Sequence, residues 1–299
     1  MTVWELDIRT GWRVGLAVEA MLLLMMAGLI VIAVLQPVNL LTFIVSVLAV
    51  GALLAALMLA YWLWGLLNAS YTMDRNAIAI TWGNNRHQIP LASVREVLSG
   101  ADLQNIRLRQ GLYFPGHFVG TGEAEGLAPI LFYAVAGAKQ QIIVRTETLA
   151  YALSPTDLDG FREALEERRA MGPTQEVVEQ SSHPAFLDWP IWQDHAALAA
   201  LSGGGLLLLL LVGVLAWRYP ALPPQIALRF TDEGAPLMLT EAARIFYLAL
   251  IGLLFLILNS VLGLFLYTRE RVAAYFLWIG NLFLQAALWV AVIAILLLQ

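Results

Sequence analysis

The sequence predicts an integral membrane α-helical protein with five transmembrane helices and a β-rich domain inserted between the second and third of them. Hydrophobic residues make up 60% of the 299 positions and charged residues only 13%, whereas a soluble globular chain is roughly half apolar and a quarter charged. Five apolar stretches each reach the ~20 residues that cross a hydrocarbon layer of about 30 Å. Between the second and third stretches, short runs alternate apolar and polar residues, as β-strands do.

The predicted spans are residues 14–35, 40–67, 196–217, 242–267 and 272–298. Pro37 ends the first helix within a very short turn, so residues 1–69 are expected to form an antiparallel hairpin of transmembrane helices. Residues 196–299 hold the other three spans, with an external loop at 218–241. The first span is too long for the apolar core of a signal peptide, and we expect it to be retained.

The arginines predict the orientation, because positive charge in short loops is retained on the cytoplasmic side. One side of the predicted membrane is flanked by Arg9, Arg13, Arg269 and Arg271. The turn at Pro37 has no charge, although Arg218 and Arg229 in the loop assigned to the outside dilute the bias. We expect a multi-pass protein of the inner (plasma) membrane, with the N-terminus and the inserted domain cytoplasmic and the C-terminus external.

Residues 70–171 form the predicted β domain, and residues 172–195 a linker with an interfacial segment. Residues 77–82 and 141–144 alternate like strands, and Gly83-Asn84-Asn85 fits a tight hairpin turn. The middle of the domain is expected to be irregular or edge structure because of its many turn formers, Gly111, Pro115, Gly116, Gly120, Gly122 and Gly126.

A helix is expected to close this domain. Ser154 can cap it with Pro155 at its first position. Phe161 and Leu165, four residues apart, would share the helical face that packs on the sheet.

An ordered series of short motifs resembles bacterial membrane-anchored pleckstrin-homology (PH) domains. The motifs are Ile89-Pro90-Leu91 with Ser93-Val94, Tyr113-Phe114-Pro115-Gly116-His117-Phe118-Val119-Gly120, Phe132-Tyr133-Ala134, and Tyr151-Ala152-Leu153-Ser154-Pro155 with Gly160-Phe161. The resemblance implies a PH-like fold for the inserted domain, closed by its C-terminal helix. Separately, the loop at 222–236 is similar to that of an uncharacterised bacterial membrane-domain family that also occurs in immunity proteins against secreted toxins, although this chain has Ala227 and Arg229 where that family usually has His.

A possible interaction surface of the domain consists of Arg86, Arg95, Arg107, Arg109 and His117. PH domains of other organisms bind inositol phosphates through basic hairpins. Residues 70–170, however, carry ten cationic and eleven acidic side chains, a net of −1, and lack the basic field that anionic lipid requires. A turn histidine bonded to backbone is the simpler interpretation of His117.

Catalysis has no visible basis in the sequence, because no nucleotide-binding, metalloprotease or nucleophile-elbow motif occurs. Absence of cysteine excludes thiol chemistry, and a net charge of −5 disfavours nucleic acid as a partner. The best metal-ligand group is His183, Asp188, Asp194 and His195, but its spacing matches no recognised site. We expect no enzyme activity, no metal and no cofactor.

Polar residues within the spans are candidates for function or for helix contacts. Glu19 lies ~9 Å along the helix from Arg13 at 1.5 Å per residue, so an interfacial or paired carboxylate is favoured over a proton relay. Asn259 and Asn281 fall at similar depths and are expected to meet or to reach a common water or partner side chain, with Gln285 on the face of Asn281.

These features predict a non-enzymatic membrane-anchored adaptor or accessory subunit whose cytoplasmic PH-like domain mediates protein interaction in a membrane assembly. Its partners would be membrane lipid and other membrane or cytoplasmic proteins. The alternative is a small transporter or toxin-immunity-type protein with a cavity among the helices, in which Glu19 and the amides would line a path.

Overall fold

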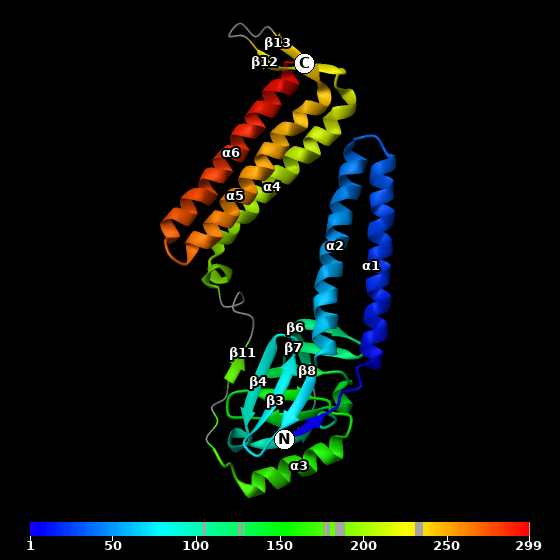
Figure 1. Cartoon of the computed structure of the whole chain (residues 1–299), viewed down its shortest axis with the longest axis vertical. Coiled ribbons are helices and arrows are strands. Elements are labelled where there is room, and N and C mark those ends of the chain that lie inside the picture. The colour runs from blue at the N-terminus through cyan, green and yellow to red at the C-terminus, as the bar shows by residue number, and fades with distance from the viewer. Residues whose placement is uncertain are drawn as a thin grey trace. The chain divides into compact units, whose positions relative to one another are not determined.

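The computed structural model describes residues 1–103, 106–124, 127, 129–175, 177, 180–182, 189–230 and 236–298. The chain divides into two compact units (Figure 1). The first comprises Met1–Leu24 and Ala52–Pro184, and the second comprises Met25–Gly51 and Ala185–Gln299.

Five helices of the described part are long and apolar enough to cross a membrane. They are α1 (Arg9–Leu35), α2 (Leu40–Leu67), α4 (His195–Arg218), α5 (Phe246–Tyr267) and α6 (Arg271–Leu297). Their bounds agree closely with the predicted spans, because span length and apolar composition are local properties of the sequence. The chain is a multi-pass membrane protein with a β-rich domain between α2 and α4.

The β-rich domain contains two sheets. The five-stranded sheet has the order β1-β2-β3-β4-β11, with strands Thr2–Trp4, Ser70–Met73, Ala77–Trp82, Asn85–Pro90 and Gln180–Ser182. The six-stranded sheet has the order β5-β9-β10-β8-β7-β6, with strands Glu96–Ser99, Ile142–Arg145, Ala150–Leu153, Ile130–Ala134, His117–Glu123 and Arg107–Phe114. All neighbouring strands are antiparallel except β8 and β10, which are parallel.

Helix α3 (Leu158–Met171) closes the domain as predicted, and Phe161 and Leu165 are both fully buried on its inner face. The hydrophobic core that contains Phe161 and Leu165 also includes side chains from both sheets. The expected cap was wrong: Asp157 caps α3 by accepting a hydrogen bond from the Gly160 N–H. The hydroxyl oxygen of Ser154 instead accepts a bond from the Val135 N–H, because Ser154 is buried beside β8.

Strand β1 joins the domain to the residues that precede the first membrane helix. It pairs with β2, with Val3 opposite Thr72. The ring of Trp4 packs edge-on against Phe161 of α3 at 5.3 Å between centroids. Residues 1–69, predicted as a helical hairpin, therefore begin with a strand that extends the sheet of the inserted domain.

The hairpin of β6 and β7 runs through the segment for which irregular or edge structure was expected. Gly111 and Gly120 lie opposite each other in this strand pair, at φ +140° and +150°. A Cβ on Gly120 would lie 2.0 Å from the backbone oxygen of Gln110, so glycine here permits close strand contact. The edge part of the prediction is confirmed, because β6 is the outermost strand of its sheet.

In the second unit, α4, α5 and α6 pack together around small residues. Gly204, Gly252 and Gly263 each face a large side chain of α6, respectively Asn281, Gln285 and Trp278. Small residues at such positions let membrane helices approach closely. The loop between α4 and α5, predicted only as an external loop, contains a β-hairpin of β12 (Gln225–Phe230) and β13 (Pro236–Glu241).

Candidate interaction site

The domain is docked directly onto the first two membrane helices. Gly11 of α1 lies against Gly116 in the turn between β6 and β7, so closely that a Cβ on Gly11 would be 2.1 Å from the Gly116 oxygen. Leu66, near the end of α2, is fully buried in the core of the domain. Gly65 and Gly83 also meet, with 3.1 Å between a Cβ on Gly83 and the Cα of Gly65. The two turns of the domain therefore lie where these helices begin and end.

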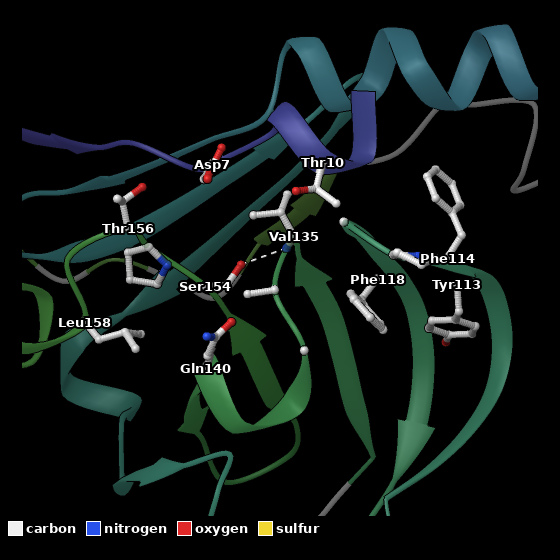
Figure 2. Close-up of a pocket in the computed structure, with 15 residues that line it drawn as sticks. Asp7, Thr10, Tyr113, Phe114, Phe118, Val135, Gln140, Ser154, Thr156 and Leu158 are labelled. Atoms are coloured by element: carbon white, nitrogen blue, oxygen red, sulfur yellow. Dashed lines mark hydrogen bonds between the residues drawn. The ribbon is translucent and has the colours of Figure 1, made fainter. Parts of the chain in front are cut away.

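A groove of about 750 Å³ opens beside this junction (Figure 2). Its lining residues come from the segment before α1, the β6–β7 turn, the end of β8 and the connection from β10 to α3. They are Asp7, Thr10, Tyr113, Phe114, Pro115, Gly116, Phe118, Val135, Ala136, Gly137, Gln140, Ser154, Pro155, Thr156 and Leu158. This volume is within the ~300–1,000 Å³ typical of ligand sites.

The groove has two unlike sides. Figure 2 shows Tyr113, Phe114 and Phe118 on one side, and Thr156 and Leu158 on the other. Among the lining residues, two have ionisable side chains, Asp7 and Tyr113, and none is cationic. The side chain of Asp7 is exposed, and one of its oxygens also accepts a bond from the Arg9 N–H at 3.2 Å. The site is thus aromatic, with an acidic group at its edge.

Hydrogen bonds hold the segments that form the groove. The backbone N–H and the hydroxyl of Thr156 both donate to the Glu5 oxygen, each at 2.9 Å. The Val135 N–H donates to the Ser154 hydroxyl oxygen at 2.7 Å. The segment before α1 is thereby tied to the start of α3, and the end of β8 to the end of β10.

Behind the groove, a buried tyrosine pair continues this network. The hydroxyl of Tyr71 donates a hydrogen bond to the backbone carbonyl oxygen of Tyr133 and accepts one from the backbone N–H of Ser154. Burial raises the pKa of the Tyr71 phenol well above its usual range. Burial likewise raises the pKa of Tyr133 to about 12, and its hydroxyl lies 2.7 Å from Nε2 of His87. Both phenols remain protonated at neutral pH, so this part of the domain supplies hydrogen bonds and no charge.

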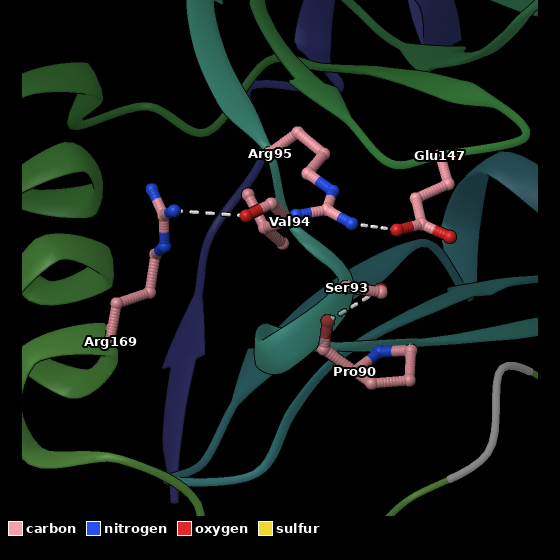
Figure 3. Close-up of polar contacts among 6 residues, drawn as sticks. All are labelled: Pro90, Ser93, Val94, Arg95, Glu147 and Arg169. Carbon is pink, nitrogen blue, oxygen red and sulfur yellow. Dashed lines mark hydrogen bonds and ion pairs between the residues drawn. The ribbon is translucent and has the colours of Figure 1, made fainter.

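The four arginines of the predicted surface are dispersed. Arg86 is exposed on β4 of the five-stranded sheet. Arg95 precedes β5, whereas Arg107 and Arg109 lie on β6 at the opposite edge of the same sheet. Arg95 forms an ion pair with Glu147 (Figure 3), and Arg109 forms a two-bond pair with Glu123 at 2.9 Å. Their separation and these carboxylates leave no shared basic patch.

Arginine also contributes to packing within the domain. Figure 3 shows Arg169 of α3, which donates to the backbone oxygen of Val94 at 2.9 Å. Arg168 of the same helix donates to the hydroxyl of Thr2 in β1 at 2.7 Å. These two side chains hold α3 against the segment before β5 and against β1, so both serve the packing of the domain.

His117 is buried among aromatic rings and does not line the groove. It stacks on Phe114 at 4.9 Å and meets Trp62 and Trp82 edge-on, each at 5.7 Å. Its Nδ1 lies 3.1 Å from the Leu112 oxygen. Burial lowers the pKa of this imidazole. His117 therefore packs between the β6–β7 turn and α2, and its role is structural.

Glu19 lies one helical turn after Gly15, on the face of α1 that packs against α2. A Cβ on Gly15 would be 2.2 Å from Leu63 of α2. One carboxylate oxygen of Glu19 is inaccessible and has no hydrogen-bond partner among the described residues. The choice between an interfacial carboxylate and a proton relay stays a prediction.

The amides of α6 contact both neighbouring helices. Gln285 donates from Nε2 to the Gly252 oxygen of α5 at 2.9 Å, an interhelical contact of the kind expected. Asn281 is buried against Gly204 of α4. No hydrogen bond joins it to Asn259, which is only partly buried and lies within the described part of α5. Asn281 thus packs on α4, and the expectation that the two amides reach a common water or partner side chain stays a prediction.

Asp194 links the start of α4 to the end of α5 and to the first turns of α6. It caps α4, accepts from Tyr267 of α5 and accepts from Tyr275 of α6, the latter two at 2.6 Å. These hydroxyl bonds lower its pKa to about 2. His183 and Asp188 of the predicted metal-ligand group lie outside the described residues. Among residues that are described, no cluster of three or more His, Asp or Glu side chains has metal-site geometry.

Sequence reasoning missed the groove and the Asp194 contacts. A signal for the groove was present in the alternation of Trp4, Leu6 and Ile8 with Glu5 and Asp7. The three apolar residues all pack on the domain core. This period of two is a strand pattern, and it would have placed Asp7 on the domain surface.

Comparison with known proteins identifies the family of the inserted domain. The family model described as Bacterial PH domain matches residues 69–169. No curated protein and no solved structure matches the chain. The match covers the strands from β2 to β10 and nearly all of α3. Residues 69–169 are a bacterial PH domain, and the chain that carries them is a multi-pass membrane protein.

Proposed function

We propose that this protein is a non-enzymatic membrane-anchored adaptor or accessory subunit, whose PH domain holds another protein at the cytoplasmic face of the membrane. The observation that carries the proposal is the docking of the domain onto α1 and α2. Contacts from Gly11, Leu66 and β1 fix the groove beside the junction of helices and domain. A flexible tether would leave the domain free to rotate. The docked arrangement instead holds the groove in a fixed orientation relative to α1 and α2.

The character of the groove supports protein as the partner. Its aromatic side chains and hydrogen-bonding rim resemble the composition of interaction sites, in which aromatic residues are enriched. The dispersed arginines argue against an inositol phosphate, because a basic field is required to hold such a ligand. The PH domain would act as a binding module, and the helices as its anchor.

A transport path among the helices is the second candidate, and one observation favours it. Trp278, Asn281 and Gln285 are buried along α6, and each has a polar atom without a hydrogen-bond partner among the described residues. Unsatisfied polar groups are costly at membrane depth and often mark a path. On this alternative, Gln285→Leu would abolish activity while leaving the fold intact.

Orientation is tested by labelling, since the chain has no cysteine. Gln36→Cys places a thiol in the turn between α1 and α2, and Asn84→Cys places one in the β3–β4 turn; both positions are exposed. A membrane-impermeant maleimide should label position 36 in intact cells and position 84 only after permeabilisation. The reverse pattern would place the PH domain outside and overturn the cytoplasmic part of the proposal.

Partner binding is tested by photo-crosslinking in living cells. Benzoylphenylalanine replaces Phe118, an aromatic residue of the groove, and in a control it replaces Met171, which is exposed at the end of α3. The proposal predicts a discrete protein adduct from position 118 and none from position 171. Adducts to lipid alone, or equal protein adducts from both positions, would contradict it.

A further inference from the structure

We infer that the groove binds an arginine- or lysine-containing extended segment of a partner membrane protein, at the point where that segment leaves the membrane. This inference rests on the proposed function and names the chemistry of the partner. Three observations support it: the charge of the lining, its aromatic rings and its place beside the start of α1.

The charge of the lining favours a cation. The lining residues include the carboxylate of Asp7 and no Lys, Arg or His. Arg9 and Lys139 are neighbours of lining residues in the sequence, but neither lines the groove. A phosphate, a carboxylate or an anionic headgroup would meet a negative charge here without a compensating positive one. A basic side chain would find in Asp7 an acceptor for a charge-assisted hydrogen bond.

The aromatic side suits the rest of a basic side chain. Tyr113, Phe114 and Phe118 line the groove opposite Thr156 and Leu158, with Asp7 along the edge (Figure 2). Arginine and lysine lay their apolar stems on hydrophobic surface and keep the charged head in water. Their cationic heads are also attracted by the faces of aromatic rings. A single basic side chain can therefore contact both kinds of wall.

The place of the groove indicates where such a side chain would come from. Thr10 of the lining is in the first turn of α1, and Gly116 of the lining touches Gly11. The groove is thus adjacent to the level at which α1 enters the membrane. On the cytoplasmic side, segments of membrane proteins at this level carry an excess of Lys and Arg. The groove is therefore positioned for the type of segment that its chemistry favours.

A direct binding experiment uses the full chain in a neutral detergent and three end-capped fluorescent peptides. The peptides share one sequence of alternating leucine and a variable residue, which is Arg in the first, Gln in the second and Glu in the third. Asp7→Asn removes the charge and keeps an oxygen that can accept from the Arg9 N–H. Glu167→Gln, at an exposed acid of α3 outside the groove, is the matched control.

The arginine peptide should bind the unaltered chain most tightly and the glutamate peptide least. Asp7→Asn should weaken binding of the arginine peptide about threefold to fivefold, the range of an exposed ion pair, and leave the glutamine peptide unchanged. Asp7→Arg should reverse the preference and bind the glutamate peptide better than the arginine peptide. Glu167→Gln should alter none of these affinities, and thermal melting should show that each variant is folded.

The inference is overturned by equal affinity for the three peptides, by no measurable binding of any, or by equal effects of Asp7→Asn and Glu167→Gln. Failure here is distinguishable from failure of the proposed function. A protein adduct from position 118 whose crosslinked segment carries no Lys or Arg would leave the adaptor role intact and remove the basic-segment inference. Absence of a specific adduct would instead count against the adaptor role itself.

Discussion

Gly11 in the first turn of α1 and Gly116 in the β6–β7 turn meet backbone to backbone. A Cβ on either residue would lie 2.1 Å from a backbone atom of the other. Gly116 also has φ +84°, a conformation that favours glycine. The membrane helix and the PH domain therefore approach as closely as two backbones permit, and neither glycine is replaceable without movement.

Gly11→Ala is expected to destabilise the docked domain relative to Gly28→Ala. Both glycines lie in α1, but a Cβ on Gly28 would meet nothing within 4 Å. The helix-propensity gain of roughly 1 kcal/mol applies to both changes, whereas only Gly11→Ala adds the overpacking cost of about 1–3 kcal/mol. Thermal unfolding in detergent measures the difference. Equal stability of the two variants would show that the contact does not form.

Tyr71→Phe should lower the unfolding free energy of the PH domain by about 1–3 kcal/mol, the usual cost of leaving buried hydrogen-bonding groups unsatisfied. The change removes the hydroxyl that donates to the backbone carbonyl oxygen of Tyr133 and accepts from the backbone N–H of Ser154. Tyr61→Phe, at an exposed tyrosine of α2, is the control and should be neutral. Denaturant titration of both variants checks this, and a neutral Tyr71→Phe would exclude the proposed network.

Asp194 should make the packing of α4, α5 and α6 sensitive to acid. Its pKa is lowered from 3.8 to about 2 by hydrogen bonds from Tyr267 and Tyr275. A carboxylate with a lowered pKa in the folded state adds stability above its unfolded pKa, and this is lost as the pH falls through the folded pKa. The Tm advantage over Asp194→Asn should be full above pH 3.8 and disappear toward pH 2. An advantage that does not change over this range would contradict the assignment.

Gln285→Leu should weaken the contact of α6 with α5, because it removes the bond from Nε2 to the Gly252 oxygen. Such contacts contribute about 0.6 kcal/mol on average and up to roughly 2 in membrane helices. Phe283→Leu, at an exposed position of the same helix, is the matched control. Unfolding in mixed micelles compares the two. A larger loss for Phe283→Leu would indicate that the face of α6 is assigned incorrectly.

The five membrane helices, the closing helix and the buried face of Phe161 and Leu165 were predictable from the sequence, because span length and helical period are local. Strand β1 was not predicted, since three residues before a span give little pattern by themselves and their partner Ser70–Met73 is distant in the chain. The tertiary pairing, and not local propensity, makes them a strand.

Apart from the alternation before α1, the sequence carries no signal for the groove, for a related reason. Asp7, Tyr113, Val135 and Ser154 are brought together only by the fold. The contact of Asn281 with Gly204 also escaped prediction. Rise per residue gives the depth of an amide in the membrane, but its rotation depends on which neighbouring helix offers a glycine at that level.

The central claim, that the segment before α1 is part of the PH domain and locks it to the membrane helices, is tested most directly by one disulfide. Because the chain has no cysteine, Val3→Cys with Thr72→Cys creates a single pair at directly opposed positions of β1 and β2. Ala79 is opposite Thr72 on the next strand, and Val3→Cys with Ala79→Cys is the control, since two strand spacings of about 4.8 Å exceed the span of a disulfide. Mild oxidation in native membranes should crosslink the first pair rapidly and the control pair not at all. No crosslink in the first pair, or equal crosslinking in both, would show that the N-terminal segment is not held in the sheet.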